Sequence, residues 1–276
     1  MIITIDGPAG SGKSTVARKL ANRLGFLHLN SGALYRAISL KAGDLAISLD
    51  DEDAVAALAA QTTFTFELIS EKSGEDSKSG GVGGLDGKES SPLLTRLLVD
   101  GFDMSDRIGS ETAGECASRV AVHAKVRELL FRVQRNVADN INAGSGSAIC
   151  CSLVVEGRDA GSIVFPRADL KVYLEAEFDV RVERRFHEFT AHGAAENVER
   201  VREEMRKRDF RDTTRTVAPQ QRADDAVLVD TSQLSADEAV ERIVVLINNL
   251  PAAPLMERAR TEKAAHLRSK EGKSWK

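Results

Sequence analysis

The sequence predicts an α/β protein with a five-stranded parallel sheet that is covered by helices on both faces. Short apolar runs typical of strands alternate with segments whose apolar residues recur every three to four positions, as in helices. Hydrophobic residues make up 42% of the 276 residues, which is enough for a sizeable core. Lys and Arg number 38 against 42 Asp and Glu, so the formal net charge is −4.

Five short apolar runs are the expected strands: residues 2–5, 27–29, 151–155, 170–174 and 226–229. Helical periodicity follows several of them. The first helix, 16–24, comes after a glycine-rich turn, and Gly25 provides a typical C-terminal stop. The remaining expected helices are 126–141, 178–189 and 240–247.

Composition and spacing exclude several classes of protein. No window approaches the about 18 uninterrupted apolar residues of a membrane span. The start, Met1 to Asp6, has no basic region or long apolar run, so we expect no secretory or transit peptide. Cys116, Cys150 and Cys151 are too few for a disulfide framework, which favours a reducing, cytoplasmic location. The mild acidity argues against a nucleic-acid binder, and the histidine spacing gives no reason to expect structural zinc.

Two segments fall outside the alternation of strands and helices. Residues 70–92 contain six Gly and six Ser among 23 positions, and we expect a mobile insertion because so few apolar side chains cannot offset its ordering entropy. Residues 251–276 carry seven Lys or Arg and three Asp or Glu, a net charge of +4. We expect this basic tail to be a solvated extension, with contact to an acidic partner as the alternative.

A phosphate-binding loop follows the first expected strand and opens the first helix. Residues 7–14, GPAGSGKS, match the pattern G-x-x-x-x-G-K-[ST]. Its glycines let backbone N–H groups turn toward a β-phosphate, and the helix N-terminus adds positive charge there. Lys13 is expected to bridge the β- and γ-phosphates, and Ser14 to ligate Mg²⁺. The residues expected to bind ATP are Gly7, Pro8, Ala9, Gly10, Ser11, Gly12, Lys13, Ser14 and Thr15.

Arginines are grouped in the second half of the chain. Arg181, Arg184 and Arg185 lie on the expected helix 178–189. Arg208, Asp212 and Arg215 have the spacing i, i+4 and i+7, which places them on one face if the segment is helical. Such clusters also occur on solvated helices. Beside a phosphate loop they favour phosphoryl transfer to a second anion, because guanidinium groups offset the repulsion between two phosphates.

Together these segments closely resemble bacterial-type cytidylate kinases, which phosphorylate CMP and dCMP. The resemblance runs from about residue 2 to 247 without the Gly/Ser-rich segment. It departs from the usual family pattern at Asn30, where Asp is common, and at Gly109, where Arg is expected. The segments that carry it are 7–15, 30–36 (NSGALYR), 117–121, 126–128, 156–166 (EGRDAGSIVFP) and 208–219 with the pattern RDxxDxxRxxAP.

The resemblance implies a P-loop nucleoside monophosphate kinase, expected to be a monomer, with ATP and CMP or dCMP as substrates and Mg²⁺ as cofactor. It divides the chain into a core, a monophosphate-binding insertion, a lid with an acceptor-contacting helix, and the tail. The core is 1–36, 110–180 and 216–250, the insertion 37–109, the lid 181–215 and the tail 251–276.

The resemblance also assigns roles to single residues. Ser31, Arg36 and Arg158 would hold the acceptor phosphate. Ser118, Arg127, Asp159 and Arg215 would read the cytosine, while Arg208 and Asp212 would meet the sugar. Arg181, Arg184 and Arg185 would act in catalysis with Lys13. Cytosine presents two acceptors and one donor, and Ser, Arg and Asp together supply the matching groups.

Two alternatives remain open from the residues alone. One is a kinase for another monophosphate such as UMP or AMP, which would need a different set of acceptor residues. The other is a nucleotide-gated ATPase or switch module, which would need a residue that positions water and loops that face a partner.

Overall fold

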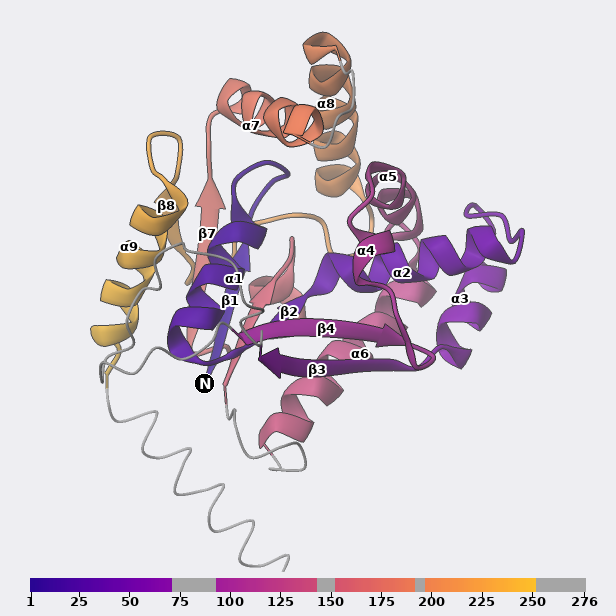
Figure 1. Cartoon of the computed structure of the whole chain (residues 1–276), viewed down its shortest axis with the longest axis horizontal. Helices are drawn as coiled ribbons and strands as arrows, with labels where there is room; N and C mark the ends of the chain where they lie inside the picture. The colour runs from indigo at the N-terminus through magenta and orange to yellow at the C-terminus, as the bar shows by residue number, and fades with distance from the viewer. Residues whose placement is uncertain (71–92, 143–151, 192–196, 252–276) are drawn as a thin grey trace, which may run out of the picture.

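A five-stranded parallel sheet forms the core of the protein, whose computed structural model describes residues 1–70, 93–142, 152–191 and 197–251 (Figure 1). The strand order is β2-β6-β1-β7-β8, and all neighbours run parallel. This confirms the predicted fold class. The strands are β1 (Ile2–Asp6), β2 (Leu27–Asn30), β6 (Leu153–Glu156), β7 (Leu170–Glu175) and β8 (Val227–Asp230).

All five strands end one residue later than expected, and two of them also begin later. The strand expected at 151–155 begins at Leu153 and extends to Glu156, and the one expected at 226–229 covers Val227–Asp230. Of the segments expected to be irregular, 71–92 and 252–276 lie outside the described residues, as do Cys150 and Cys151.

Helices cover both faces of the sheet. Val154 packs with α1 (Lys13–Leu24) and α9 (Ala236–Asn248), whereas its neighbours Leu153 and Val155 pack with α6 (Ala124–Asn142). Successive side chains of a strand point to opposite faces, so the two clusters lie on opposite sides of the sheet. Each of these helices corresponds to one expected from periodicity. No described helix combines the length and apolar character needed to cross a membrane.

A second, antiparallel sheet in the middle of the sequence was not predicted. It consists of β3 (Phe64–Ser70), β4 (Leu93–Val99) and β5 (Phe102–Asp103). A two-residue turn joins β4 to β5, and Asp100 (φ 51°) and Gly101 (φ 84°) both have the positive φ that a type I′ turn requires. The helices of this region are α2 (Ser31–Asp44), α3 (Glu52–Gln61), α4 (Ser105–Ile108) and α5 (Glu111–Val120).

The helices α7 (Phe178–Ala191) and α8 (Val198–Thr214) lie together beyond the carboxyl ends of β1 and β7 (Figure 1). They share a small apolar cluster that includes Val182, Met205 and Ala9 of the phosphate loop. One expectation needs correction at the end of α8. Arg215 follows the helix with extended backbone (φ −60°, ψ 143°), so Arg208 and Asp212 lie on the helix and Arg215 lies beyond it.

Candidate active site

At two positions of the loop between β1 and α1, both the backbone angle and a close neighbour exclude any residue but glycine. Gly7 has φ 148°, and a Cβ there would lie 2.0 Å from the carbonyl oxygen of Leu174. Gly10 has φ 76°, and its Cβ would lie 2.8 Å from the carbonyl oxygen of Arg181. The loop therefore passes close to β7 and α7 and ends at α1, whose first residue is Lys13.

A cavity of about 170 Å³ joins this loop to the predicted acceptor residues. All of the predicted acceptor residues line it, and so do Ala9, Gly10, Gly12, Lys13, Ser14 and Thr15 of the loop. Gly7, Pro8 and Ser11 do not line it. The acceptor residues come from distant parts of the chain: Ser31, Arg36, Ser118, Arg127, Arg158, Asp159, Arg208, Asp212 and Arg215.

Positive charge is concentrated at the end of the cavity near the loop. Burial, together with the guanidinium of Arg158, lowers the pKa of Lys13 well below its usual value. Burial and nearby guanidinium groups also lower the pKa of Arg208, to about 9, and that of Arg36. A cation with a lowered pKa is one whose charge is poorly compensated by the protein. This end of the cavity is therefore suited to anions.

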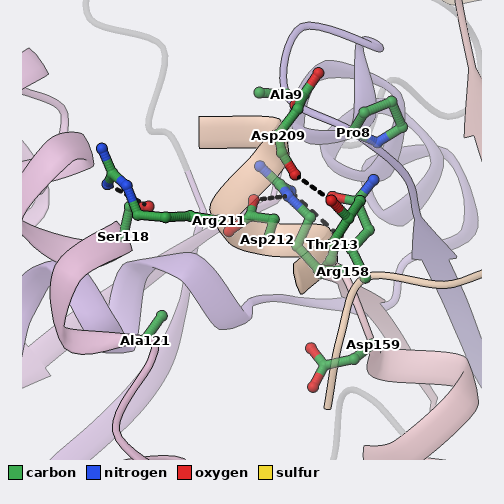
Figure 2. Close-up of polar contacts among 12 residues, drawn as sticks. Pro8, Ala9, Ser118, Ala121, Arg158, Asp159, Asp209, Arg211, Asp212 and Thr213 are labelled. Atoms are coloured by element: carbon green, nitrogen blue, oxygen red, sulfur yellow. Dashed lines mark hydrogen bonds and ion pairs between the residues drawn. The ribbon is translucent and has the colours of Figure 1, made fainter. Parts of the chain in front are cut away.

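One carboxylate partly balances these charges. Arg158 Nε donates to Asp212 Oδ2 at 3.1 Å, which ties the loop after β6 to α8 (Figure 2). Burial opposes ionisation of Asp212, but the guanidinium groups of Arg158 and Arg208 hold its pKa below the usual value. Asp212 is therefore a carboxylate at neutral pH and an acceptor for hydroxyl groups.

A second arginine–carboxylate pair also lines the cavity. Arg127, which is 1% exposed, donates to Asp159 and, at 3.1 Å, to the carbonyl oxygen of Ala121. Its guanidinium lies close to two aromatic rings, 5.5 Å from the centre of Tyr35 and 5.0 Å from that of Phe131. This pair offers both donors and an acceptor in an enclosed space, as recognition of a base requires.

Ser118 and Arg215 line the cavity as well. Arg211 reaches from α8 to α5 and donates to Ser118 Oγ at 3.0 Å (Figure 2). Arg215 Nε donates to the carbonyl oxygen of Ala218 at 2.6 Å, and its guanidinium lies 3.7 Å from Asp159. Ser118 therefore has a charged partner that was not predicted from the sequence.

The three arginines of α7 point to different surroundings. Arg181 donates to the carbonyl oxygen of Ala9 at 2.9 Å and pairs with Asp209 at 2.7 Å. Arg184 donates to the carbonyl oxygen of Thr231 at 2.5 Å, after β8. Arg185 is the member of this group that lines the cavity. The structure thus brings Arg185 to the site, whereas Arg181 and Arg184 contact neighbouring loops.

The oxygen donors beside the loop fit a magnesium ion. Ser14 Oγ donates to Glu156 Oε2 at 2.6 Å, and Glu156 Oε1 lies 3.1 Å from His28 Nε2. Burial opposes ionisation of Glu156, but its hydrogen bonds to His28 and Ser14 hold its pKa below the usual value. A hydroxyl beside a buried carboxylate is a hard-oxygen pair, and Mg²⁺ commonly takes one or two such groups plus substrate phosphates.

Sequence reasoning missed several residues that line this site. Glu156 ends β6 two residues before Arg158, and a carboxylate at the end of a buried parallel strand was a signal available in the sequence. Tyr35 and Glu188 also line the cavity. Asn30 lines it too, and its side chain caps α2 by accepting from the N–H of Ala33 at 3.0 Å.

Comparison with known proteins shows the family of this sequence. The sequence model of the cytidylate kinase family matches residues 3–249. Cytidylate kinase from Thermotoga petrophila is 38% identical over 245 residues, covering 89% of this chain and 96% of that protein. Cytidylate kinase from Methylococcus capsulatus is 38% identical over 240 residues, covering 87% and 93%. The one from Colwellia psychrerythraea is 35% identical over 247 residues, covering 90% and 96%. The chain therefore belongs to the cytidylate kinase family.

Proposed function

We propose that this protein transfers the γ-phosphoryl group of ATP to the 5′-phosphate of CMP or dCMP. The observation that carries the proposal is the cavity in which a phosphate loop faces a group of arginines, most of them half-buried. Arg36 and Arg208 have lowered pKa values there, so bound phosphates restore a charge balance that the protein alone does not provide. The relatives named cytidylate kinase support CMP as the acceptor.

In the proposed reaction an oxygen of the CMP phosphate attacks the γ-phosphorus of ATP. The bond from that phosphorus to the β,γ-bridging oxygen breaks, and the products are ADP and CDP. The second pKa of a phosphomonoester lies near 6, so the attacking oxygen is already ionised and needs no strong base. Catalysis then consists of positioning and charge stabilisation by Lys13 and Arg185. Arg181 and Arg184 would join them through a movement of α7.

The acceptor is proposed to lie along the cavity with its base toward Arg127. Ser31, Arg36 and Arg158 would bind its phosphate, and Arg208 and Asp212 its sugar. Asp159 is the acceptor for the cytosine amino group, while Ser118, Arg127 and Arg215 face the rest of the base. Uracil has a carbonyl in place of the amino group, so it would place one hydrogen-bond acceptor against the carboxylate of Asp159. This mismatch favours CMP over UMP.

Magnesium is the proposed cofactor, held by Ser14 and Glu156 together with ATP. When bound, it neutralises charge on the β- and γ-phosphates. We also propose that the enzyme is a cytoplasmic monomer, with the insertion at 37–109 and the lid at 181–215 closing over the substrates. Cys116, a free thiol within the described residues, is consistent with a reducing compartment.

A coupled assay that detects ADP tests the proposal across acceptors. With ATP and Mg²⁺, we expect CMP and dCMP to give a kcat/KM at least about tenfold above those of UMP and AMP, because one mismatched polar group costs about 1–3 kcal/mol. Lys13→Ala is the control, and it should abolish turnover of every acceptor. A preference for UMP or AMP would indicate another monophosphate kinase. ADP formation without an acceptor would favour the ATPase alternative.

A further inference from the structure

The hydroxyl of Tyr35 is buried in the cavity without a hydrogen-bond partner. Tyr35 lies on α2, is 6% exposed, and lines the cavity next to Arg36. Within the described part of the chain, this hydroxyl makes no hydrogen bond. Buried polar groups are almost always paired, so an unpaired one in a ligand cavity points to a contact that the ligand provides.

The surroundings of Tyr35 show which part of the ligand it faces. The charges of Arg127, Asp159 and Arg215 all act on its hydroxyl, so it lies among the residues proposed to read the base. Two donors in this group, Arg127 Nε and Arg215 Nη2, are also buried and have no hydrogen-bond partner among the described residues. Several unpaired donors beside one another call for a ligand that presents acceptor atoms.

We propose that Tyr35 is a further specificity residue for the acceptor nucleotide and that its hydroxyl donates a hydrogen bond to N3 or O2 of the pyrimidine. The inference rests on the proposed function. Asp159 takes the amino group, which is the donor on that edge of cytosine, and N3 and O2 are left for donors. Burial raises the pKa of Tyr35 to about 12, so the hydroxyl keeps its proton at neutral pH.

The hydroxyl and the ring of Tyr35 have separable roles. The ring packs against the guanidinium of Arg127, which also contacts the ring of Phe131. Tyr35→Phe keeps the ring and removes only the donor. The sequence contains two tyrosines, and the other, Tyr173, accepts a hydrogen bond from Gln220 and does not line the cavity. Tyr173→Phe is therefore a matched control for the loss of a tyrosine hydroxyl.

Calorimetric titration of the full chain with CMP tests the proposal. Tyr35→Phe should weaken CMP binding about tenfold and raise the KM for CMP, with kcat and the KM for ATP unchanged, because it leaves one base acceptor unpaired. Tyr173→Phe should bind CMP like the wild type. If the affinity for UMP falls equally, the hydrogen bond lies at O2, which both bases share. If only the affinity for CMP falls, it lies at N3, which is an acceptor in cytosine alone. Unchanged CMP binding by Tyr35→Phe overturns the proposal.

A spectroscopic measurement separates this proposal from the proposed function. Protein labelled with 3-fluorotyrosine should give two ¹⁹F signals, which the two phenylalanine variants assign. Saturating CMP should shift the signal of Tyr35 and leave that of Tyr173 in place, and a Tyr35 signal that does not move counts against the contact. If the wild type binds a different monophosphate, the proposed function fails. The comparison of Tyr35→Phe with Tyr173→Phe on that nucleotide then decides the role of Tyr35 by itself.

Discussion

Arg127 and Arg215 enter the cavity already held by the protein. Arg127 is fixed by Asp159 and a backbone carbonyl, and Arg215 by the carbonyl oxygen of Ala218. Side chains held in this way lose little rotamer entropy when a ligand arrives, and they need no reorganisation as charge moves. At the scale of single residues, recognition in this site therefore depends on the partners of each guanidinium as much as on the guanidinium itself.

The same reasoning applies to Glu156 and the metal. Glu156→Gln keeps the shape of the side chain but removes the negative charge beside Ser14. We expect about a tenfold increase in the Mg²⁺ concentration needed for half-maximal rate, because one of the two oxygen ligands of the proposed site loses its negative charge. Binding of Mn²⁺ in the presence of a non-hydrolysable ATP analogue, followed by electron paramagnetic resonance, should weaken to a similar extent.

Glu188→Gln is the control for this prediction. Glu188 also lines the cavity, but its carboxylate pairs with Arg185 at 2.8 Å and not with Ser14. It should leave the Mn²⁺ affinity unchanged. An unaltered metal affinity in Glu156→Gln would contradict the assignment and would leave Glu156 as a packing partner of His28 and Ser14.

Some of these residues could be predicted from the sequence and others could not. A phosphate loop has fixed spacing, so its residues were identified directly. The arginines of α7 were found as a group, but consecutive helical residues point about 100° apart, and in this structure Arg185 lines the cavity while Arg184 contacts Thr231. Which one lines the cavity depends on how α7 packs. The partner of Ser118 escaped prediction because Arg211 comes from a helix 93 positions away.

At the scale of elements, β1 and the segment after β6 are joined by one buried carboxylate. Asp6, the last residue of β1, accepts hydrogen bonds from the N–H groups of Ala160 (2.9 Å) and Gly161 (2.7 Å). These residues belong to η1 (Ala160–Val164), a single turn of π-helix that directly follows Asp159. Asp6 therefore helps to fix the backbone that carries the carboxylate proposed to read the base.

This contact gives a prediction for the pH dependence of stability. Burial, with Asp159 nearby, raises the pKa of Asp6 from 3.8 to about 6. Between those values the folded protein retains a proton that the unfolded chain has released, so the contribution to stability is full below about pH 4 and is lost as pH rises through 6. At about 1.4 kcal/mol per pKa unit, the loss is about 3 kcal/mol.

Urea unfolding of Asp6→Asn at pH 4 and pH 7 measures this contribution. The free energy of unfolding of the variant, relative to the wild type, should rise by about 3 kcal/mol from pH 4 to pH 7. Asp225→Asn should show the opposite sign, because the hydrogen bond from Lys171 lowers the pKa of Asp225 and that stability is lost as pH falls. A difference between Asp6→Asn and the wild type that does not change with pH would refute the prediction.

The elements of the second sheet show where periodicity fails. Most strands of the parallel sheet are buried runs, and they were recognised from local sequence. The strands β3 and β4 flank a long Gly/Ser-rich stretch, and their pairing depends on contacts between residues about 30 positions apart. A local signal was present in Asp100-Gly101, the dipeptide typical of a two-residue hairpin turn. The main sheet was thus predictable from local pattern, whereas the second sheet required the turn signal.

At the scale of the whole molecule, charge is distributed unevenly. The chain carries a formal net charge of −4, yet it gathers Arg36, Arg158, Arg185 and Arg208 around one cavity with Lys13. These groups come from α2, α7, α8 and the loop after β6, so their mutual repulsion acts between elements that must pack together. In the ligand-free protein this repulsion lowers the free energy of unfolding, and anions that bind in the cavity reduce the repulsion.

Thermal unfolding tests this balance across the whole chain. The melting temperature in pyrophosphate should be several degrees higher than in KCl at equal ionic strength. A ligand at about 100 times its Kd adds about 2.7 kcal/mol to the free energy of unfolding. Burial and the charge of Arg158 lower the pKa of Arg208 to about 9, and Arg208→Gln removes this cation. The ligand-free variant should therefore have a higher melting temperature than the ligand-free wild type. It should also gain less from pyrophosphate, because one of the groups that attract the anion is missing. If Arg208→Gln lowers the melting temperature of the free protein, the cluster is balanced without a ligand, and the electrostatic basis of the proposed anion site is wrong.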